Sequence, residues 1–371
     1  MSNTKSFLSK LRKLDGAVNP NSDALNQCLS SPSPSVNWAF GVDGFGMPFG
    51  SSMILWGPPK GGKSIICNAF IGEFHRNDPE AIAVTFNTEL RGEFQSNTSM
   101  LTKMGVDPDR LVTYDVNQPE LIFDRIEKEI AALCQDGAKI KMIIIDSLSA
   151  ITGRRTQNAD TILTQQIGDQ AATIKDGLAR ILPTIRKHKI ALIMTAHARA
   201  EMDMKEQMRG KTIKMQSSWA TKHVAEFFCF VEPNRSKDGK ITLDGETFVD
   251  DSVKDFMDKA QGHAHKIRFR VEESSLGFAG RTAEFTLDYN KGIINQYEEI
   301  FTLAKNLGIL HRPNNTMYEY NGRSWRGLVA MLTAIRDEQV LRDDLLEQIK
   351  LKDKDHRAGN ITKNTVDEAV S

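Results

Sequence analysis

The sequence predicts an α/β fold around a mostly parallel central sheet, and three observations favour it. From residue 36 to about 300, apolar strand-like runs alternate with helical patterns, which is typical of strands joined by crossover helices. The runs at 141–146 (KMIIID) and 191–196 (ALIMTA) are nearly all apolar, as expected of strands covered on both faces. A glycine-rich segment at 57–64, GPPKGGKS, separates a strand-like run from a helix-capable one.

Eight strands and five helices are expected in the α/β region. The strands are expected at 51–56, 81–86, 111–116, 141–146, 191–196, 226–232, 265–272 and 283–289. The helices are expected at 63–75, 93–104, 119–135, 165–187 and 217–225. The last strands alternate more strictly between apolar and polar residues, so we expect them to extend the sheet with antiparallel pairs.

The 371 residues divide into four predicted parts. An N-terminal arm and linker cover 1–35, where KSFLSKLRKL is amphipathic at helical spacing and LSSPSPS has the composition of a linker. The α/β core covers 36–297. A small C-terminal region covers 298–350 and includes a hairpin at MYEYNGRSW, because Asn-Gly favours a tight turn. Residues 351–371 are polar and are predicted to form a mobile tail.

The composition restricts the setting and the partners of the chain. Lys+Arg and Asp+Glu both number 48, so any nucleic-acid binding must use local basic patches rather than an overall basic charge. The four cysteines are widely spaced without a CxxC pair, which predicts reduced thiols and a cytoplasmic setting. Neither a signal peptide nor a membrane span is expected, because no stretch reaches about 18 uninterrupted apolar residues.

The segment GPPKGGKS matches the phosphate-binding pattern G-x-x-x-x-G-K-[ST]. Glycine lets backbone N–H groups approach phosphate oxygens, and the positive end of the following helix points at the same anion. We expect the Lys63 ammonium to reach the β and γ phosphates and the Ser64 hydroxyl to ligate Mg²⁺. A plain glycine-rich turn is the alternative. The expected nucleotide contacts are Gly57, Pro58, Pro59, Lys60, Gly61, Gly62, Lys63, Ser64 and Ile65.

Polar residues at the ends of three predicted strands complete an ATP site. Asp146, which ends KMIIID, is the expected metal-side carboxylate, although an Asp in this place can also cap a helix. Glu89, after AIAVTFNT, is the expected catalytic carboxylate, because ligands of α/β sheets bind at the carboxyl ends of strands; a solvated loop glutamate is the alternative. His197, after ALIMTA, is expected to contact the γ-phosphate and sense its loss, unless it only packs at the strand end.

Taken in order along the chain, these residues and several other segments resemble the RecA-type recombinases, and more closely their phage UvsX-type branch. The matching segments cover roughly residues 36 to 328. They are VNWAFGVDGFGMPFGSSMILWGPPKGGKS, FNTEL, MGVDPDRL, KMIIIDSLSAIT, the IGD of QQIGDQ, TAEFTLDYNKGI and LGILHRPNNTMYEYNGRSWRG. The resemblance implies a RecA-like P-loop ATPase core that hydrolyses ATP to ADP and phosphate with Mg²⁺ when bound to DNA. It also implies a place in the bacterial host cytoplasm if a phage encodes the chain.

The resemblance also implies roles for residues that the motifs alone do not assign. Asn117 falls where the family has a polar adenine contact, and Tyr289 where it has an aromatic against the nucleotide; packing in the core is the alternative for Tyr289. Ser147 joins Asp146 at its strand end. His197 aligns with the polar residue that links the γ-phosphate to the second DNA loop.

Two DNA loops are implied at about 152–168 and 199–217. The second loop has no acidic residue between Glu206 and Glu226, and its methionines suit insertion between bases. A solvated amphipathic helix is the alternative, because the charges also fit helical spacing. The implied DNA contacts are Arg154, Arg155, Arg199, Lys205, Arg209, Lys211 and Lys214.

One stretch departs from the family. Glu272 and Glu273 stand where relatives have lysines that reach the neighbouring subunit's ATP, and Arg281 is the nearest replacement. An acidic pair disfavours phosphate unless it pairs with nearby cations. The candidates for such pairing are Lys266, Arg268 and Arg270.

The function implied by the resemblance is ATP-dependent recombination. The chain would form filaments on single-stranded DNA, pair that strand with homologous duplex DNA and exchange strands, in recombination and repair. Mediator or single-strand-binding proteins are further partners. Two alternatives stay open, namely a RecA-fold ATP-binding regulator, which the Glu272 and Glu273 departure favours, and a helicase-like motor without strand exchange.

Overall fold

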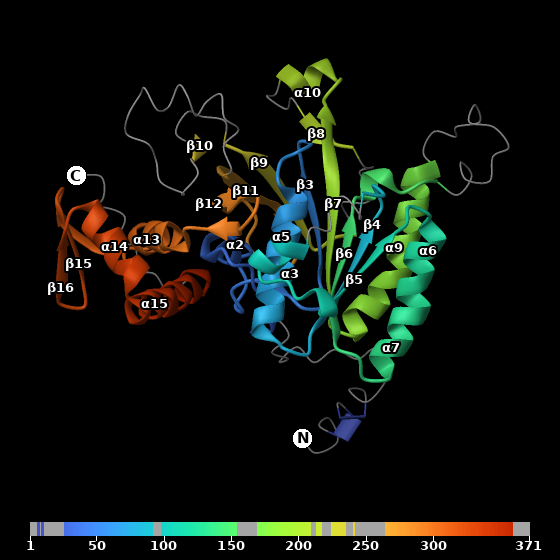
Figure 1. Ribbon diagram of the computed structural model, residues 1–371, viewed down its shortest axis with the longest axis horizontal. Helices are drawn as coiled ribbons and strands as arrows, with labels where there is room; N and C mark the ends of the chain where they lie inside the picture. Colours follow the sequence, from blue (N-terminus) through green and yellow to red (C-terminus); the bar gives the residue numbers. More distant parts are fainter. Residues whose placement is uncertain are drawn as a thin grey trace.

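The architecture is that of a mixed α/β protein, as the computed structural model shows (Figure 1). The structure describes residues 6–7, 9–10, 26–91, 98–153, 169–208, 213–216, 224–234, 240–241 and 264–358. Within these ranges no helix combines the length and the apolar character needed to cross a bilayer.

A large twisted sheet forms the centre of the molecule, with eleven strands among the described residues. Its strands are β3 (Ser52–Gly57), β4 (Ile82–Asn87), β5 (Leu111–Asp115), β6 (Ile140–Asp146), β7 (Ala191–Ala200), β8 (Ile213–Met215), β9 (Phe227–Pro233), β10 (Lys240–Ile241), β11 (Ala264–Ser274), β12 (Thr282–Asp288) and β13 (Gly292–Ile294). The main order is β13-β12-β11-β9-β3-β7-β6-β4-β5. From β9 to β5 every neighbouring pair is parallel, whereas β11, β12 and β13 add antiparallel pairs at one side. The predicted α/β class is therefore confirmed.

Helices cover both faces of the parallel part (Figure 1). On one face lie α3 (Lys63–Asn77) and α5 (Thr98–Lys103). On the other lie α9 (Asp169–Lys187) and a continuous helical segment made of α6 (Pro119–Asp124), the π-helical turn η3 (Arg125–Ile130) and α7 (Ala131–Gln135). Each face has its own apolar cluster, because alternate residues of a strand point to opposite faces. Thus Leu55 and Ile144 pack beneath α3, and Ile54 and Ile145 pack beneath α9.

From residue 26 to the sheet, the chain forms a short pair of strands and one α-helix. These are β1 (Cys28–Leu29), β2 (Met47–Pro48) and α2 (Pro34–Ala39). Three serines of the expected linker, Ser31, Ser33 and Ser35, are buried, and the hydroxyl of Ser33 caps α2 by accepting the N–H of Val36. Ser33 also donates to Glu299, which additionally accepts the N–H of Ser35 at 3.1 Å. The serine-rich stretch is therefore packed structure that joins the N-terminal and C-terminal segments.

The C-terminal region is a small layer of helices and one antiparallel sheet at the side of the molecule (Figure 1). Its elements are α13 (Gln296–Asn306), β14 (His311–Asn314), β15 (Met317–Tyr320), β16 (Arg323–Arg326), α14 (Leu328–Asp337) and α15 (Gln339–Arg357). Asn321 and Gly322 both have positive φ, 47° and 74°, as the predicted tight hairpin turn requires. Helix α15 continues to Arg357, so a helix occupies the first seven residues of the segment expected to be a tail.

Charged side chains fix α15 to the α/β core. The carboxylate of Asp353 is buried between Arg281, 2.8 Å away, and Arg357, 3.0 Å away. Arg357 also pairs with Asp43, and Arg281 stacks on the ring of Trp38 at 4.5 Å. A buried carboxylate held by two guanidinium groups is a stable arrangement only while both partners remain. The C-terminal region is therefore bound to the α/β core at a defined position.

Candidate active site

The glycine-rich segment forms a tight loop between β3 and α3. Helix α3 begins at Lys63, so the N–H groups of its first turn point toward the loop. The Nζ atom of Lys63 is buried and donates to the carbonyls of Gly57 at 3.1 Å and Pro58 at 2.9 Å. Burial lowers the pKa of Lys63, while the nearby carboxylates of Asp146 and Glu89 act in the opposite direction. The loop therefore holds an ammonium group beside the positive end of a helix, which is a site for an anion.

Two glycines of this loop are required for different reasons. A Cβ on Gly57 would lie 2.0 Å from the carbonyl oxygen of Val231, so the close approach of β9 excludes any side chain there. Gly62 has φ of 82° and a Cβ there would lie 2.5 Å from Leu287 of β12. The loop is thus fixed from outside by β9 and β12 as well as by its own turn.

Asp146 lies at the carboxyl end of β6, beside the loop. Its Oδ2 accepts the hydroxyl of Ser64 at 2.6 Å, and its Oδ1 accepts the hydroxyl of Thr195 from β7. A carboxylate and a hydroxyl next to a phosphate-binding loop are the hard oxygen donors that Mg²⁺ prefers. Ser64 and Asp146 therefore fit the predicted metal site. Thr195 was not foreseen, because a threonine within a strand gives no sequence signal of such a contact.

Glu89 follows β4 at the same edge of the sheet and contacts three side chains. Its Oε1 lies 2.6 Å from Nε2 of His197 and 3.3 Å from the hydroxyl of Ser147. Its Oε2 lies 3.3 Å from Arg91. Because an ionised carboxylate only accepts hydrogen bonds, Nε2 of His197 carries the proton. The structure therefore brings together Glu89 and His197, which are 108 positions apart in the sequence.

A link between β4 and β6 fixes the relative position of the two carboxylates. The hydroxyl of Thr88 donates to the carbonyl of Ser147 at 2.6 Å and accepts the N–H of Ser147 at 2.7 Å. The N–H of Thr88 donates to the carbonyl of Asp146 at 2.8 Å. Thr88 and Ser147 are both fully buried, so these bonds are shielded from water. Glu89 and Asp146 are next to these two residues and are therefore held at a fixed spacing.

The two residues expected near the base of the nucleotide lie in different places. Tyr289 follows β12, whose carboxyl end is at the same edge as that of β3, and its ring meets His265 edge-on at 5.5 Å. Leu287, two residues earlier, packs on Gly62.

Asn117 follows β5, four strand positions from β3, which is roughly 19 Å away at the usual strand spacing. Its carbonyl accepts both the N–H and the hydroxyl of Thr152. An adenine contact by Asn117 remains a prediction.

Beyond the active-site edge, β7 continues into a hairpin with β8 (Figure 1). The pairs are Ala198 with Met215, Arg199 with Lys214 and Ala200 with Ile213, and the N–H of Gln216 closes the hairpin on the carbonyl of His197. The short helix α10 (Met204–Met208) lies at the tip. Among its described residues, the second predicted DNA loop therefore forms a hairpin with a short helix. It is not the single amphipathic helix of the alternative.

The hairpin tip carries exposed methionines and cations. Met202, Met204 and Met208 are 82%, 69% and 82% exposed. Arg199 and Lys205 are exposed, and Lys214 pairs with Glu201 at 2.5 Å. An exposed apolar group among cations marks a contact surface. The remaining predicted DNA contacts lie outside the described residues; they are Arg154, Arg155, Arg209 and Lys211.

Glu272, one of the two acidic residues that depart from the family pattern, has two defined partners. Oε2 of Glu272 accepts the indole N–H of Trp56 at 2.9 Å, and Oε1 pairs with Arg270 at 2.6 Å. Trp56 directly precedes Gly57, and its ring packs on Phe230 with 4.6 Å between centroids. Glu272 therefore supports the strand that leads into the phosphate loop, and Arg270 neutralises it.

Arg281 is held within the C-terminal contact described above. It pairs with Asp353 and donates to the carbonyl of Trp38 at 2.8 Å, and its side chain is only 15% exposed. Lys266 and Arg268 are held more loosely, at 3.6 Å from Glu298 and 3.5 Å from Glu232. Arg281 is therefore poorly placed to reach a neighbouring subunit, whereas Lys266 and Arg268 have more freedom to do so.

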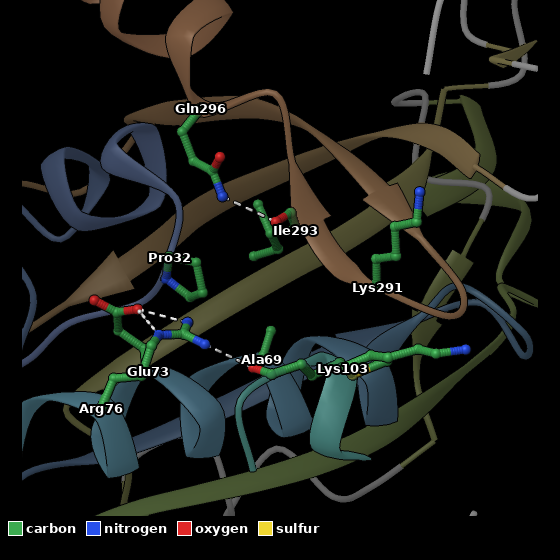
Figure 2. Close-up of a pocket in the computed structure, with 9 residues that line it drawn as sticks. Pro32, Ala69, Glu73, Arg76, Lys103, Lys291, Ile293 and Gln296 are labelled. Atoms are coloured by element: carbon green, nitrogen blue, oxygen red, sulfur yellow. Dashed lines mark hydrogen bonds and ion pairs between the residues drawn. The ribbon is translucent and has the colours of Figure 1, made fainter. Parts of the chain in front are cut away.

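A separate cavity of about 470 Å³ lies along α3, away from the phosphate loop (Figure 2). Figure 2 shows Arg76 paired with Glu73, while Lys103 and Lys291 extend along one side of the cavity. Arg76 also donates to the carbonyl of Met104 at 3.0 Å. None of the predicted site residues lines this cavity, so it is distinct from the nucleotide site.

The comparisons with known proteins all indicate the same family. The profile of the RecA N-terminal domain matches residues 14–223. The protein RecA of Mycoplasmopsis pulmonis (strain UAB CTIP) is 22% identical over 326 residues, which is 88% of this chain and 85% of that protein. The protein RecA of Wolbachia sp. subsp. Drosophila simulans (strain wRi) is 23% identical over 323 residues, 87% and 80% of the two chains. The protein RecA of Chlorobaculum tepidum is 22% identical over 329 residues, 87% and 83% of the two chains.

Proposed function

This chain belongs to the RecA N-terminal domain family, and on that basis we propose that it is an ATP-dependent recombinase. It assembles on single-stranded DNA as a filament, pairs that strand with a homologous duplex and exchanges strands. The observation that carries the proposal is the convergence of Lys63, Asp146, Glu89 and His197 at one sheet edge from which a hairpin of cations and methionines extends. The closer likeness to the phage branch and the mediator partners remain predictions.

Each residue of the site has a proposed role in ATP hydrolysis. Lys63 and the N–H groups of the first turn of α3 bind the β and γ phosphates. Ser64 and Asp146 hold Mg²⁺, which when bound offsets the negative charge of the phosphates. Oε1 of Glu89 is contacted by His197 and Ser147, so Oε2, which lies 3.3 Å from Arg91, is the oxygen that would orient water and accept its proton.

The same geometry supports a connection between nucleotide and DNA. His197 contacts the catalytic carboxylate with its side chain and closes the hairpin with its carbonyl. Any change in the contacts of His197 on ATP binding therefore reaches the hairpin through one strand. A ligand shifts such an equilibrium only by its difference in affinity for the two arrangements. We expect ATP to favour the arrangement that binds DNA, and hydrolysis to release it.

The regulator alternative depended on the acidic departure at Glu272 and Glu273. The contacts of Glu272 with Trp56 and Arg270 give Glu272 a structural role beside the phosphate loop, so this one of the two residues is explained without that alternative. Strand exchange provides the test. Joint molecules should form between single-stranded circles and homologous linear duplex only when ATP and Mg²⁺ are both present. ATP binding without any joint molecule would favour the regulator, and directional unwinding of a fork would favour the motor.

A further inference from the structure

The first inference concerns Thr195 and rests on the proposed metal site. Thr195 lies on β7 and is fully buried, and its hydroxyl donates to Oδ1 of Asp146. The other oxygen of Asp146 accepts Ser64. We propose that Thr195 is a positioning residue that orients Asp146 toward Mg²⁺. Groups that hydrogen-bond a metal-ligating carboxylate fix its orientation, and their loss costs roughly 10- to 100-fold in metal affinity.

A matched control exists on β4, which is separated from β7 by β6. The hydroxyl of Thr85 is buried and has no hydrogen-bond partner among the described residues. Replacing Thr85 with Val therefore changes the same atoms as replacing Thr195 with Val, but breaks no hydrogen bond. Any general effect of placing a valine in the sheet will appear in both variants.

The test measures equilibrium binding of a fluorescent ATP analogue as Mg²⁺ is varied, without turnover. Thr195→Val should shift the Mg²⁺ midpoint roughly 10-fold upward, whereas Thr85→Val should leave it unchanged. An unchanged midpoint in Thr195→Val would overturn the inference. Ser64→Ala separates this outcome from failure of the proposed metal site, because only the latter predicts that Ser64→Ala also leaves the midpoint unchanged.

The second inference concerns Glu201 in the hairpin and rests on the proposed DNA contact there. Glu201 is buried, and its Oε1 accepts three donors. These are the Nζ of Lys214 at 2.5 Å and the N–H groups of Met202 at 2.8 Å and Asp203 at 3.1 Å. Lys214 also lies directly opposite Arg199 in the hairpin register. Like charges in such a pair repel, and the Glu201 carboxylate offsets that repulsion.

The cation expected to bind DNA is therefore already paired within the chain. From these contacts we infer that Glu201 competes with DNA phosphates for Lys214, so that DNA must displace a carboxylate to gain this contact. The ion pair is only partly shielded, with the Lys214 side chain 39% exposed, so such a displacement has a modest cost. Glu201 would thus weaken the binding of DNA that contacts the hairpin only through Lys214. DNA that also contacts other residues of the hairpin would be weakened less.

Glu201→Gln isolates this competition, because the amide oxygen can still accept the two backbone N–H groups while the charge is removed. Affinity for a fluorescent oligothymidylate should rise roughly 3- to 10-fold. The slope of log affinity against log salt should steepen by about 0.7, the value for one added phosphate contact on a single strand.

Two controls exclude a general charge effect. Asp203→Asn removes a charge from the same hairpin, where Asp203 accepts the N–H of Lys205 rather than pairing with Lys214. It should change affinity less than Glu201→Gln does. In a Lys214→Gln background, Glu201→Gln should give no gain.

Three results would overturn the inference. They are an unchanged or weaker affinity in Glu201→Gln, an equal gain in Asp203→Asn, and a gain that persists without Lys214. Failure of the proposed DNA contact is distinguished by Lys205→Ala and Lys214→Gln. If neither single change weakens binding, the hairpin does not bind DNA at all.

Discussion

The Nε2 atom of His197 lies 2.6 Å from Oε1 of Glu89, so the residue at which the β7–β8 hairpin begins is bonded to the predicted catalytic carboxylate. The carbonyl of His197 accepts the N–H of Gln216, which is the bond that closes the hairpin. One residue therefore contacts both the predicted catalytic carboxylate and the hairpin.

Changing Glu89 to Gln should stop hydrolysis without preventing ATP binding. The amide can still accept from His197 and Ser147 but cannot take a proton from water, so turnover should fall roughly 100-fold or more. Phosphate release measures turnover, and filter binding measures retention of DNA in the presence of ATP. DNA should remain bound far longer than with the unchanged protein. Turnover at the original rate would remove Glu89 from the mechanism.

Changing His197 to Ala should uncouple DNA from hydrolysis. The hairpin bond uses the backbone of His197 and survives, whereas the bond to Glu89 is lost. We expect single-stranded DNA to bind within about threefold of normal and to stimulate ATP turnover several-fold less. The ratio of rates with and without DNA measures this. Full stimulation in the variant would show that the coupling does not pass through this side chain.

Changing Lys63 to Ala should abolish nucleotide-dependent DNA binding. It removes a buried ammonium that is held by the loop carbonyls beside the first turn of α3. Titration with a fluorescent ATP analogue should show affinity at least about 100-fold weaker, because a charge-assisted contact to phosphate is lost. Lys187→Ala, an exposed lysine at the far end of α9, is the control. Equal affinity for the ATP analogue in both variants would refute the proposed role of Lys63 in phosphate binding.

Changing Met202, Met204 and Met208 together to Ser should weaken DNA binding without altering its salt dependence. The three side chains are highly exposed and carry no charge, so their contribution is apolar contact with bases. We expect roughly a 10-fold loss of affinity for single strands at every salt concentration. A loss confined to low salt would point to a change in hairpin structure, because apolar contacts are not screened.

Changing Glu299 to Gln should remove a loss of stability that occurs as pH rises from 4.5 to about 8. Burial raises the pKa of Glu299 to about 8, while hydrogen bonds from Ser33 and Ser35 act in the opposite direction. The unfolded chain releases this proton near pH 4.5, so the folded state binds more protons between there and about pH 8. The free energy of unfolding that is present below pH 4.5 therefore falls as pH rises to about 8, by at most about 5 kcal/mol. Urea unfolding from pH 5 to 9 should show a smaller decline for the variant, and identical declines would contradict this.

Most of the sheet could be predicted from local pattern. All eight expected strands are present, because buried parallel strands are nearly continuous apolar runs and the antiparallel ones alternate. The Asn-Gly turn was also predictable, since both residues adopt positive φ. The β7–β8 hairpin, in contrast, could not be predicted from local pattern. Strand β8 has only three residues, Ile213–Met215, and they lie among charges that also fit a helix.

The contacts that fix the site are the part that the sequence does not reveal. Thr88 and Thr195 are ordinary strand threonines until folding places them beside Ser147 and Asp146. The serine-rich stretch has the composition of a linker, yet Ser33 is bonded to Glu299, 266 positions away. Long-range polar contacts of this kind leave no periodic signal, because they depend on tertiary packing.

If the hairpin on β7 and the proposed ATP site act as one unit, ATP turnover should depend on DNA. Phosphate release should be measured at saturating ATP and Mg²⁺ with and without a long single strand. We expect DNA to stimulate turnover at least about 10-fold, and we expect this stimulation to fall sharply in Lys205→Ala at moderate salt while the rate without DNA is kept. Equal turnover with and without DNA in the unchanged protein would contradict it.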